Sequence, residues 1–309
     1  MSAAMLKERA RLLQQLRQFF CEKGFLEVQT PLASHEIIPE AHINPPQLSD
    51  GRYLQASPEM HHKLLLCQGV GPLFEVTKSF RGGEHGRLHR PEFTMVEWYR
   101  PGDSMQDGID LLDELIQLLL GVPRAKRTSY REAFLRVYDT DPFLAQDCVL
   151  QGLAEEALGE GLGVIAHNPS TLRDDCLNAL LSLGVEPMLG IDTPEVLYHY
   201  PETQAALAEV EADEHGKAVA QRFELYYQGV ELANGYYELT DPQEMRRRLE
   251  DANQIRCDQA EAALPLPETL LKSMESRGLP CCAGVALGFD RLVMLATGTE
   301  SISEVIACD

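Results

Sequence analysis

Hydrophobic and polar positions recur along this chain with two periods, one typical of helices and one typical of strands. Apolar residues at helical spacing predict a first helix over residues 5 to 22, and Gly24 follows it as a stop signal. The next segment, "FLEVQTPLAS", alternates as a strand does. Proline donates no ladder hydrogen bond, so Pro31 indicates the end or the edge of a sheet. Residues 36 to 52 are rich in Pro, Asn and Asp, which is typical of a loop.

Two stretches have the pattern of β-hairpins. Residues 73 to 80 and 93 to 99 predict two strands around a loop that contains several glycines. "QRFELYYQGVELANGYYELTD" predicts a second hairpin, with Gly229 at the turn and Gly235 as a bulge or a point of close backbone approach.

Helices and one further strand complete the prediction. A helix follows "QASPEM", where Ser57 is a suitable cap and Pro58 suits the first turn. "CAGVALGFDRLVMLATG" predicts a small-residue strand that runs into a helix near Phe289, with Arg291 in its first turn. Periodicity predicts other helices over residues 104 to 120, 143 to 160 and 242 to 262. Residues 161 to 200 are mixed and give no definite assignment.

The composition narrows the possible functions. The 309 residues fit one large domain, and 27 basic against 48 acidic residues give a net charge of −21, which disfavours general attraction to nucleic acids and anionic lipids. No apolar stretch is long enough to span a membrane, and the charged amphipathic start differs from a signal peptide. The eight cysteines show no paired CxxC spacing, so we expect reduced thiols without a zinc site. A soluble, cytoplasmic protein with no membrane partner is predicted.

The first charged stretch, "FRGGEHGRLHRPEFTMVEWYR", places arginines and acids in one hairpin. Alternation puts Glu97 on the same strand face as Phe93, Met95 and Tyr99. A sheet with one wet face would also explain Glu97. The glycines do not form a dinucleotide fingerprint, because a strand follows them where that motif needs a helix. Of the nine histidines only His89, beside the loop arginines, stands out; His61 and His62 are predicted on a helix surface.

A second series of acids, Glu224, Glu231 and Glu238, is evenly spaced through the second hairpin. A solvated sheet face gives similar spacing. However, Glu231 and Glu238 lie among apolar residues, where a carboxylate is costly unless it is paired, protonated or bound to a cation. A metal ion, an ammonium group or an arginine would account for them.

The third stretch alternates Gly284, Ala286 and Gly288 on one strand face before the helix that carries Arg291. A strand of small residues is often only a tight packing seam. It also suits the flat floor of a ligand pocket, and a helix N-terminus beside it favours an anion. Arg291 opposes the dipole of its own helix, which favours a bound phosphate or carboxylate.

Together these stretches resemble the signatures of the class II aminoacyl-tRNA synthetases. "FLEVQTPLAS" is similar to motif 1, "LFEVTKSFRGGEHGRLHRPEFTMVEWY" to motif 2 and "GVALGFDRLVML" to motif 3. "SPEM", "PEFTMVEWY" and "ELANGYYELTD" resemble the lysyl branch, and Glu59 suits an ammonium-bearing substrate. The resemblance implies an α+β fold, an antiparallel sheet flanked by helices. The chain has no room for the anticodon-binding barrel of that branch, so a single catalytic domain over 1–309 is expected.

The resemblance implies a role for each motif residue. Arg81 and Arg291 are the implied catalytic residues that bind ATP phosphates, and Phe93 stacks on adenine. Magnesium is implied at Glu224 and Glu231. The implied ATP site comprises Arg81, Gly82, Gly83, His89, Arg90, Phe93, Glu231, Leu232, Gly288 and Arg291. The implied amino-acid site comprises Ser57, Pro58, Glu59, Glu97, Tyr99, Asn234, Glu238 and Ala286.

The expected lack of the barrel is a feature of stand-alone paralogues of the lysyl branch. "EWYRPGDSM" and the alanine in "GVALG" also resemble these paralogues. These paralogues imply adenylation of (R)-β-lysine or lysine, transfer to a lysine side chain of translation elongation factor P, a homodimer built on motif 1, and no charging of tRNA. Two departures are notable: Gly82 and Gly83 replace the usual Asn-Glu after Arg81, and Arg90 replaces a usual asparagine. An adenylate-forming enzyme with another amino acid or acceptor, and a non-catalytic regulatory paralogue, therefore remain alternatives.

Overall fold

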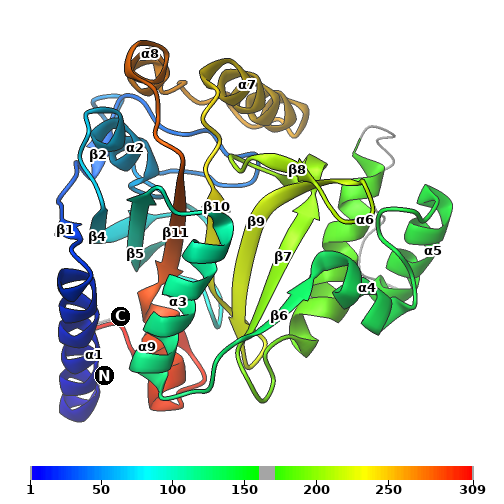
Figure 1. The fold of residues 1–309 in the computed structure, drawn as a ribbon, viewed down its shortest axis with the longest axis horizontal. Helices are drawn as coiled ribbons and strands as arrows, with labels where there is room; N and C mark the ends of the chain where they lie inside the picture. The colour runs from blue at the N-terminus through cyan, green and yellow to red at the C-terminus, as the bar shows by residue number, and fades with distance from the viewer. Residues whose placement is uncertain (1, 160–170, 308–309) are drawn as a thin grey trace. The chain divides into compact units, whose positions relative to one another are not determined.

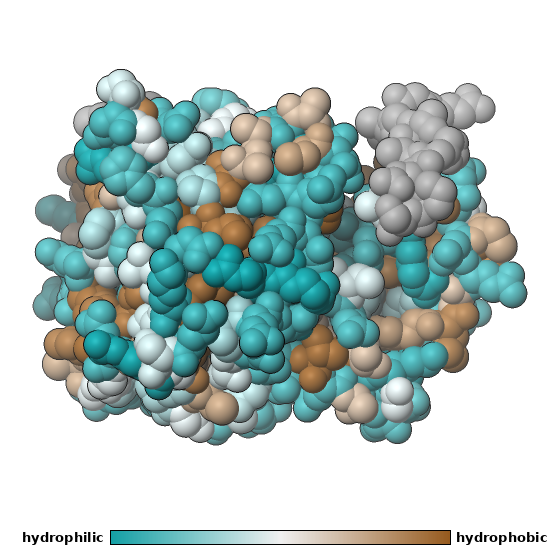
Figure 2. Space-filling model, turned by 90° about the horizontal axis from the view of Figure 1, so that it is seen from above, coloured by the Kyte–Doolittle hydropathy of each residue, from teal (hydrophilic) through white to brown (hydrophobic). Residues whose placement is uncertain are grey.

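The computed structural model describes residues 2–159 and 171–307, and their contacts group into two compact units (Figure 1). Unit 1 comprises Met1–Gly121 and Tyr237–Asp309, and unit 2 comprises Val122–Tyr236. Each unit contains both helices and strands, so the α+β prediction is confirmed. No helix within the described ranges is long and apolar enough to cross a membrane. Hydrophilic residues dominate the face drawn in Figure 2, with hydrophobic residues in separate patches, in keeping with the high acidic content.

The sheet of unit 1 has the strand order β1-β4-β5-β11. Strand β1 (Leu26–Glu27) is parallel to β4 (Leu73–Phe80), whereas β5 (Glu92–Pro101) is antiparallel to both β4 and β11 (Cys282–Gly288). A separate pair joins β2 (Ala33–Ser34) to β3 (Tyr53–Leu54). The predicted 25–34 strand is thus two short strands, with Pro31 between them. The first predicted hairpin is confirmed.

Helices surround this sheet (Figure 1). They are α1 (Ala3–Glu22), α2 (Glu59–Cys67), α3 (Met105–Leu120), α7 (Pro242–Asp258), α8 (Glu268–Arg277) and α9 (Phe289–Thr297), followed by a 3-10 turn at Ile302–Glu304. Phe20 of α1 stacks on Phe74 of β4 and tilts against Trp98 of β5, with ring centroids 4.6 and 5.1 Å apart. One face of the sheet therefore builds a core, and β5 turns Glu97 and Tyr99 to the opposite face.

Unit 2 has the strand order β10-β9-β7-β6, with β8 (Val210–Ala212) paired to β9. Strands β9 (Ala218–Tyr227), β10 (Val230–Tyr237) and β7 (Glu195–Pro201) are antiparallel neighbours, and β6 (Lys126–Ser129) is parallel to β7. The helices are α4 (Tyr130–Tyr138), α5 (Asp147–Leu158) and α6 (Leu172–Leu180), with short helical turns at Leu181–Val185, Glu186–Met188 and Glu202–Gln204. Tyr130 and Phe134 of α4 stack in its core. Each unit thus contains one parallel pair, β1 with β4 and β6 with β7, so the strand pairing is mixed, whereas an antiparallel sheet was expected.

Several local predictions need correction. Strands β9 and β10 are joined at Gln228 and Gly229, which both have positive φ (53° and 68°), so the turn is confirmed. Of the two alternatives predicted for Gly235, a bulge or a point of close backbone approach, the bulge is wrong: Gly235 pairs regularly with Phe223, and the register shift lies between Glu231 and Ala233.

The other differences concern helix ends and unpredicted elements. Pro58, expected in the first turn of α2, is its N-cap residue. Helix α8 and strands β6 and β7 were not predicted individually, because they are short and their apolar positions follow no long repeat. Residue 160, the predicted end of one helix, and residues 161–170 lie outside the described part of the chain.

Candidate active site

A buried group of carboxylates with one lysine lies on the face of the unit 1 sheet opposite to the core formed with α1. Glu59 and Lys63 lie one turn apart on α2, and the Lys63 Nζ is 2.6 Å from Glu59 Oε1. The same Nζ is 2.7 Å from Oε2 of Glu238, which follows β10 and whose N–H donates to the Cys282 carbonyl in β11. Lys63 has no exposed surface, and Glu238 is 1% exposed. The sequence prediction included both acids but missed the lysine that neutralises them.

Glu97 completes this carboxylate cluster from β5. Its two oxygens accept hydrogen bonds of 2.7 Å, Oε2 from the Ser57 hydroxyl and Oε1 from the Tyr99 hydroxyl. Ser57 Oγ also accepts the backbone N–H of Glu59 at 3.0 Å, so it stabilises the start of α2 one residue before the Pro58 cap. Five residues of the predicted amino-acid site are therefore brought together: Ser57, Glu59, Glu97, Tyr99 and Glu238.

Burial and mutual repulsion perturb the ionisation of this cluster. Burial, reinforced by the Glu59 charge, raises the pKa of Glu97 to about 8. Burial likewise raises the pKa of Glu238 to about 7, against the lowering effect of Lys63. For Lys63 itself, burial is outweighed by the carboxylates of Glu238 and Glu59, and its pKa is raised. The cluster therefore carries one permanent cation and acids that change ionisation near neutral pH.

Behind Glu97 lies a second polar layer that the sequence analysis assigned wrongly. His62 was predicted on a helix surface, but it is fully buried, and His61 is partly buried. His62 Nε2 lies 2.9 Å from Glu75 Oε2, and Glu75 also accepts from the N–H and hydroxyl of Thr30. Burial lowers the pKa of His62, while the hydrogen bonds from His62 and Thr30 outweigh burial and lower the pKa of Glu75. A neutral His62 thus donates from Nε2 to an ionised Glu75.

The small residues of β11 face this cluster. Gly284 pairs with Tyr99, Ala286 with Glu97 and Gly288 with Met95, so all three lie on the site face as predicted. A Cβ on Gly284 would lie 2.2 Å from Glu238 Oε1 and 2.3 Å from a Tyr99 ring carbon. Glycine is therefore required there by the side chains packed over it. At Ala286 the methyl group adds bulk beside Glu97.

The motif 2 arginine lies beside an aromatic ring. The guanidinium carbon of Arg81 is 5.2 Å from the centroid of Phe93, a cation–π contact, and one Arg81 nitrogen is 3.9 Å from Glu84 Oε1. Gly82 donates its N–H to the Asn44 carbonyl, and a Cβ at Gly82 would lie 2.9 Å from that oxygen. Gly83 has φ of 80°. The two glycines that depart from the family pattern thus fit this loop, and Glu84 is the acid that accompanies Arg81.

The loop between β4 and β5 also meets the motif 3 helix. An Arg291 amino group lies 2.8 Å from His89 Nε2, and Arg291 Nε donates to the Leu88 carbonyl. Arg90 donates to two carbonyls of its own loop, those of Gly86 and His89. Gly288 is the N-cap residue of α9, and a Cβ there would make only ordinary contacts with Arg291. Arg291 and His89 were predicted in one site, and they are in contact.

An unpredicted ion pair fixes the position of α9. Asp290, 1% exposed, lies 2.6 Å from an Arg9 nitrogen of α1 and accepts the Thr94 N–H. Arg9 also donates to the Thr94 hydroxyl at 2.8 Å. The residue before Arg291 is therefore tied to β5 and α1. The sequence holds no local signal for this pair, because Arg9 and Asp290 are far apart along the chain.

The hairpin of unit 2 carries the remaining predicted residues. Glu231 pairs with Tyr226, and Asn234 pairs with Glu224, on either side of the register shift. Tyr226 and Glu224 are two residues apart, so Glu224, Glu231 and Asn234 share one face, although 231 and 234 differ by an odd number. Leu232, at the bulge, is 1% exposed. The pairing of Glu231 with Tyr226 already puts both predicted metal ligands on one face, and the bulge brings Asn234 to the same face.

Glu224 already has partners on this face. It accepts hydrogen bonds from Tyr200, Tyr226 and Arg222 at 2.6, 2.5 and 2.5 Å. Asn234 donates weakly to the Tyr236 hydroxyl at 3.4 Å, and its buried Oδ1 accepts no hydrogen bond from the described residues. Within the described ranges, no three His, Cys, Asp or Glu side chains are grouped to hold a metal ion. Two carboxylates on one face still suit magnesium, which commonly takes one or two protein carboxylates with the phosphates of a substrate.

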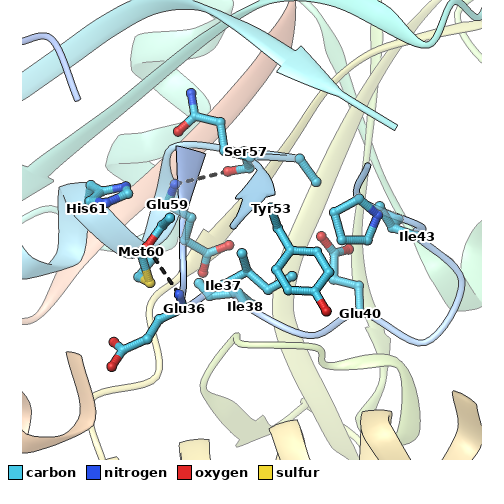
Figure 3. Close-up of a pocket in the computed structure, with 14 residues that line it drawn as sticks. Glu36, Ile37, Ile38, Glu40, Ile43, Tyr53, Ser57, Glu59, Met60 and His61 are labelled. Atoms are coloured by element: carbon cyan, nitrogen blue, oxygen red, sulfur yellow. Dashed lines mark hydrogen bonds between the residues drawn. The ribbon is translucent and has the colours of Figure 1, made fainter. Parts of the chain in front are cut away.

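A pocket of about 500 Å³, counting its opening to solvent, adjoins Glu59 in unit 1 (Figure 3). Ser57 and Glu59 form one wall. The opposite wall includes Ile37 and Ile43, from the loop predicted over 36 to 52, and Tyr53 of β3. This loop was not predicted as part of the site, because a loop without periodicity gives no signal of which side chains face a pocket.

Comparison with known proteins identifies relatives over almost the whole chain. Residues 1–308 match the family described as tRNA synthetases class II (D, K and N). A protein of Pectobacterium carotovorum subsp. carotovorum named elongation factor P–(R)-β-lysine ligase is 44% identical over 99% of this chain and 95% of its own length. A protein of Klebsiella pneumoniae strain 342 with the same name is 45% identical over 98% of this chain and 94% of its own length.

Proposed function

Because this chain belongs to the class II tRNA synthetases of the D, K and N group, we propose that it is an ATP-dependent ligase that adenylates (R)-β-lysine and transfers it to a lysine side chain of elongation factor P. Relatives of nearly equal length that bear this activity in their names support the proposal. The residues that match motifs 2 and 3, among them Arg81, Phe93 and Arg291, support the adenylation step.

The observation that carries the proposal is the charge of the carboxylate cluster. Lys63 pairs with Glu59 and Glu238, and the charges of these two acids also act on Glu97. The cluster of three acids and one lysine therefore carries two net negative charges when all three acids are ionised. A lysine-like diamino acid supplies two ammonium groups. Since an uncompensated buried charge is costly, this cluster favours a ligand with that charge over a neutral or acidic amino acid.

The proposed reaction has two steps. A carboxylate oxygen of the amino acid attacks the α-phosphorus of ATP, a mixed anhydride forms and pyrophosphate leaves. The amine of the acceptor lysine then attacks the carbonyl carbon, an amide bond forms, AMP leaves and the amine loses a proton. Arg81 and Arg291 would neutralise phosphate charge in the first step, so catalysis is positioning and electrostatic stabilisation without a general base.

The other residues of the nucleotide site have supporting roles. Phe93 would stack on adenine, with Gly82, Gly83, Leu232 and Gly288 close to the nucleotide through their backbone, and His89 and Arg90 would approach the outer phosphates. Glu224 and Glu231 would hold magnesium, which supplies charge neutralisation between the phosphates when bound. Arg222 would then share Glu224 with the metal ion. Pro58 and Asn234 complete the proposed amino-acid site.

Amino-acid-dependent exchange between ATP and pyrophosphate tests the first step over a panel of amino acids. We expect exchange with (R)-β-lysine, weaker exchange with lysine and none with aspartate. Transfer of radiolabelled β-lysine to purified elongation factor P tests the second step. Exchange without transfer would indicate another acceptor, and the absence of exchange with every amino acid would indicate a non-catalytic paralogue.

We also propose that the protein is a homodimer, that its two units form one catalytic domain and that it does not charge tRNA. Support for the dimer comes from β1, an edge strand of motif 1, where Leu26 and nearby Leu32 are 56% and 43% exposed. An isologous contact would cover both. Light scattering that gives a 34.5 kDa particle at micromolar concentration would contradict the dimer. Aminoacylation of lysine tRNA would contradict the last proposal.

A further inference from the structure

Arg256 is a buried arginine whose main partners are carbonyl oxygens. It lies in the last turn of α7 and is 3% exposed. Its guanidinium donates to the carbonyls of Ala262, Glu40 and Ile43 and to the Asn44 side-chain oxygen, at 3.0, 3.1, 2.8 and 2.8 Å. The nearest carboxylate oxygen among its described partners, Oε2 of Glu261, is 4.0 Å away. Three of these four hydrogen bonds therefore go to residues 40–44.

Residues 40–44 touch both halves of the proposed site in unit 1. Glu40 and Ile43 line the pocket beside Glu59 (Figure 3). The Asn44 carbonyl accepts the N–H of Gly82 at 2.6 Å, in the residue that follows Arg81. A methyl group at Gly82 would lie 2.9 Å from that carbonyl oxygen, so the two backbones are in close contact. A displacement of Asn44 would therefore reach both the pocket wall and the motif 2 loop.

Secondary structure does little to hold this segment. Between β2 and β3 the described chain has no helix or strand, and its regular pairing is a single bridge between Gln47 and Tyr53. Backbone carbonyls in such a segment need partners, and a planar guanidinium binds several of them at fixed angles. A lysine ammonium at the same place would keep the charge but would lose that fixed geometry.

We propose that Arg256 is a positioning residue that holds residues 40–44 against Gly82 and thereby fixes the amino-acid pocket and the ATP-binding loop in one arrangement. The roles of the pocket and the loop rest on the function proposed above. Arg256 touches neither substrate in this inference, and it acts through the Asn44 carbonyl.

The test compares Arg256→Lys with a control on the same helix. The Arg246 guanidinium forms a two-point ion pair with Glu268 instead of binding residues 40–44, so Arg246→Lys makes the same chemical change without this role. Hydrogen exchange of the Gly82 amide reports the contact with Asn44 directly. We expect that amide to lose protection in Arg256→Lys only. Because a 1 Å misplacement costs about a hundredfold, we expect kcat/KM for ATP to fall about a hundredfold, mainly through KM.

A milder variant keeps the test informative if Arg256→Lys does not fold. Asn44→Ala removes one acceptor of the guanidinium and leaves the backbone carbonyl that binds Gly82. It should shift both readouts in the same direction by a smaller factor. Unchanged Gly82 protection in both variants overturns the inference, and so does lost protection with an unchanged KM for ATP.

Failure of the proposed function would look different. If the wild type shows no exchange with any amino acid, the proposed reaction is wrong, and Gly82 protection with calorimetric binding of a non-hydrolysable ATP analogue then decides the inference. Weaker analogue binding in Arg256→Lys but not in Arg246→Lys supports it. Equal binding in the two variants overturns it.

Discussion

Replacing Glu97 by glutamine should make the substrate-free protein more stable at alkaline pH while impairing its activity. Glutamine keeps the size of the side chain and its oxygen can still accept from Tyr99. Its amide group would face the Ser57 hydroxyl, which rotates to accept instead of donating. The variant therefore resembles Glu97 in its protonated form and removes only the charge.

The sign of the effect follows from the raised pKa. Glu97 has a pKa of about 8 in the folded chain, caused first by burial and then by the Glu59 charge, against an ordinary value of 4.5. The stability contributed by the protonated acid is therefore fully present below pH 4.5 and is lost as the pH rises through 8. Since each pKa unit corresponds to about 1.4 kcal/mol, the whole loss is on the order of 5 kcal/mol.

Urea unfolding at a series of pH values between 5 and 9 measures this difference. We expect the free energy of unfolding of Glu97→Gln minus that of the wild type to rise across this range. Lys63, Glu59, Glu238, His62 and Tyr99 surround the site in both proteins, so the difference isolates Glu97. Glu92→Gln is the control, because Glu92 lies on the same strand in an exposed ion pair with Lys78.

The activity of Glu97→Gln supplies the second half of the prediction. Loss of a charged hydrogen-bond partner for the substrate ammonium should lower kcat/KM for the amino acid about ten- to a hundredfold. A flat difference curve from pH 5 to 9 would refute the ionisation argument. Unchanged kcat/KM would refute the placement of Glu97 in the amino-acid site.

Three further predictions concern the same site. Arg81→Ala and Arg291→Ala should each raise the activation barrier for pyrophosphate exchange by about 3 to 4 kcal/mol while the circular dichroism spectrum stays unchanged. Near-normal exchange in either variant would contradict its role. Calorimetry should show that Glu231→Gln weakens magnesium-dependent ATP binding more than amino-acid binding and that Glu238→Gln does the reverse; identical behaviour would indicate that these acids are structural. Ala286→Gly, which removes the methyl group opposite Glu97, should raise kcat/KM for lysine relative to (R)-β-lysine about ten- to two-hundredfold, and an unchanged ratio would place selectivity elsewhere.

Much of the unit 1 site could be predicted because the placement of its residues depends on local sequence patterns. The alternation in β5 put Glu97 and Tyr99 on one face, and the small residues of β11 put Gly284, Ala286 and Gly288 opposite them. What the pattern of β5 could not distinguish was a wet sheet face from a buried cluster. The 2% exposure of Glu97 settles that question in favour of burial, because α2 and Glu238 cover it.

Other features depend on contacts between residues distant in the chain. The sequence marks Arg256 only as one charge in a helix, and its partners Glu40, Ile43 and Asn44 lie more than two hundred residues earlier. Local sequence does not distinguish Lys63 from an exposed helix lysine, because its partner Glu238 is remote along the chain. The bulge near Leu232 changes the sheet face of the β10 residues after it. Gly82 is explained by the close Asn44 carbonyl and Gly83 by its positive φ.

By itself the sequence determined the secondary structure of the long periodic segments, the family and the residue types of the site, because periodicity, turn chemistry and motif spacing act over a few neighbouring residues. The tertiary structure alone decided which charges are buried, which are paired and which loop closes the pocket. Those properties depend on desolvation and on distances between remote segments, and both are set only when the chain has packed.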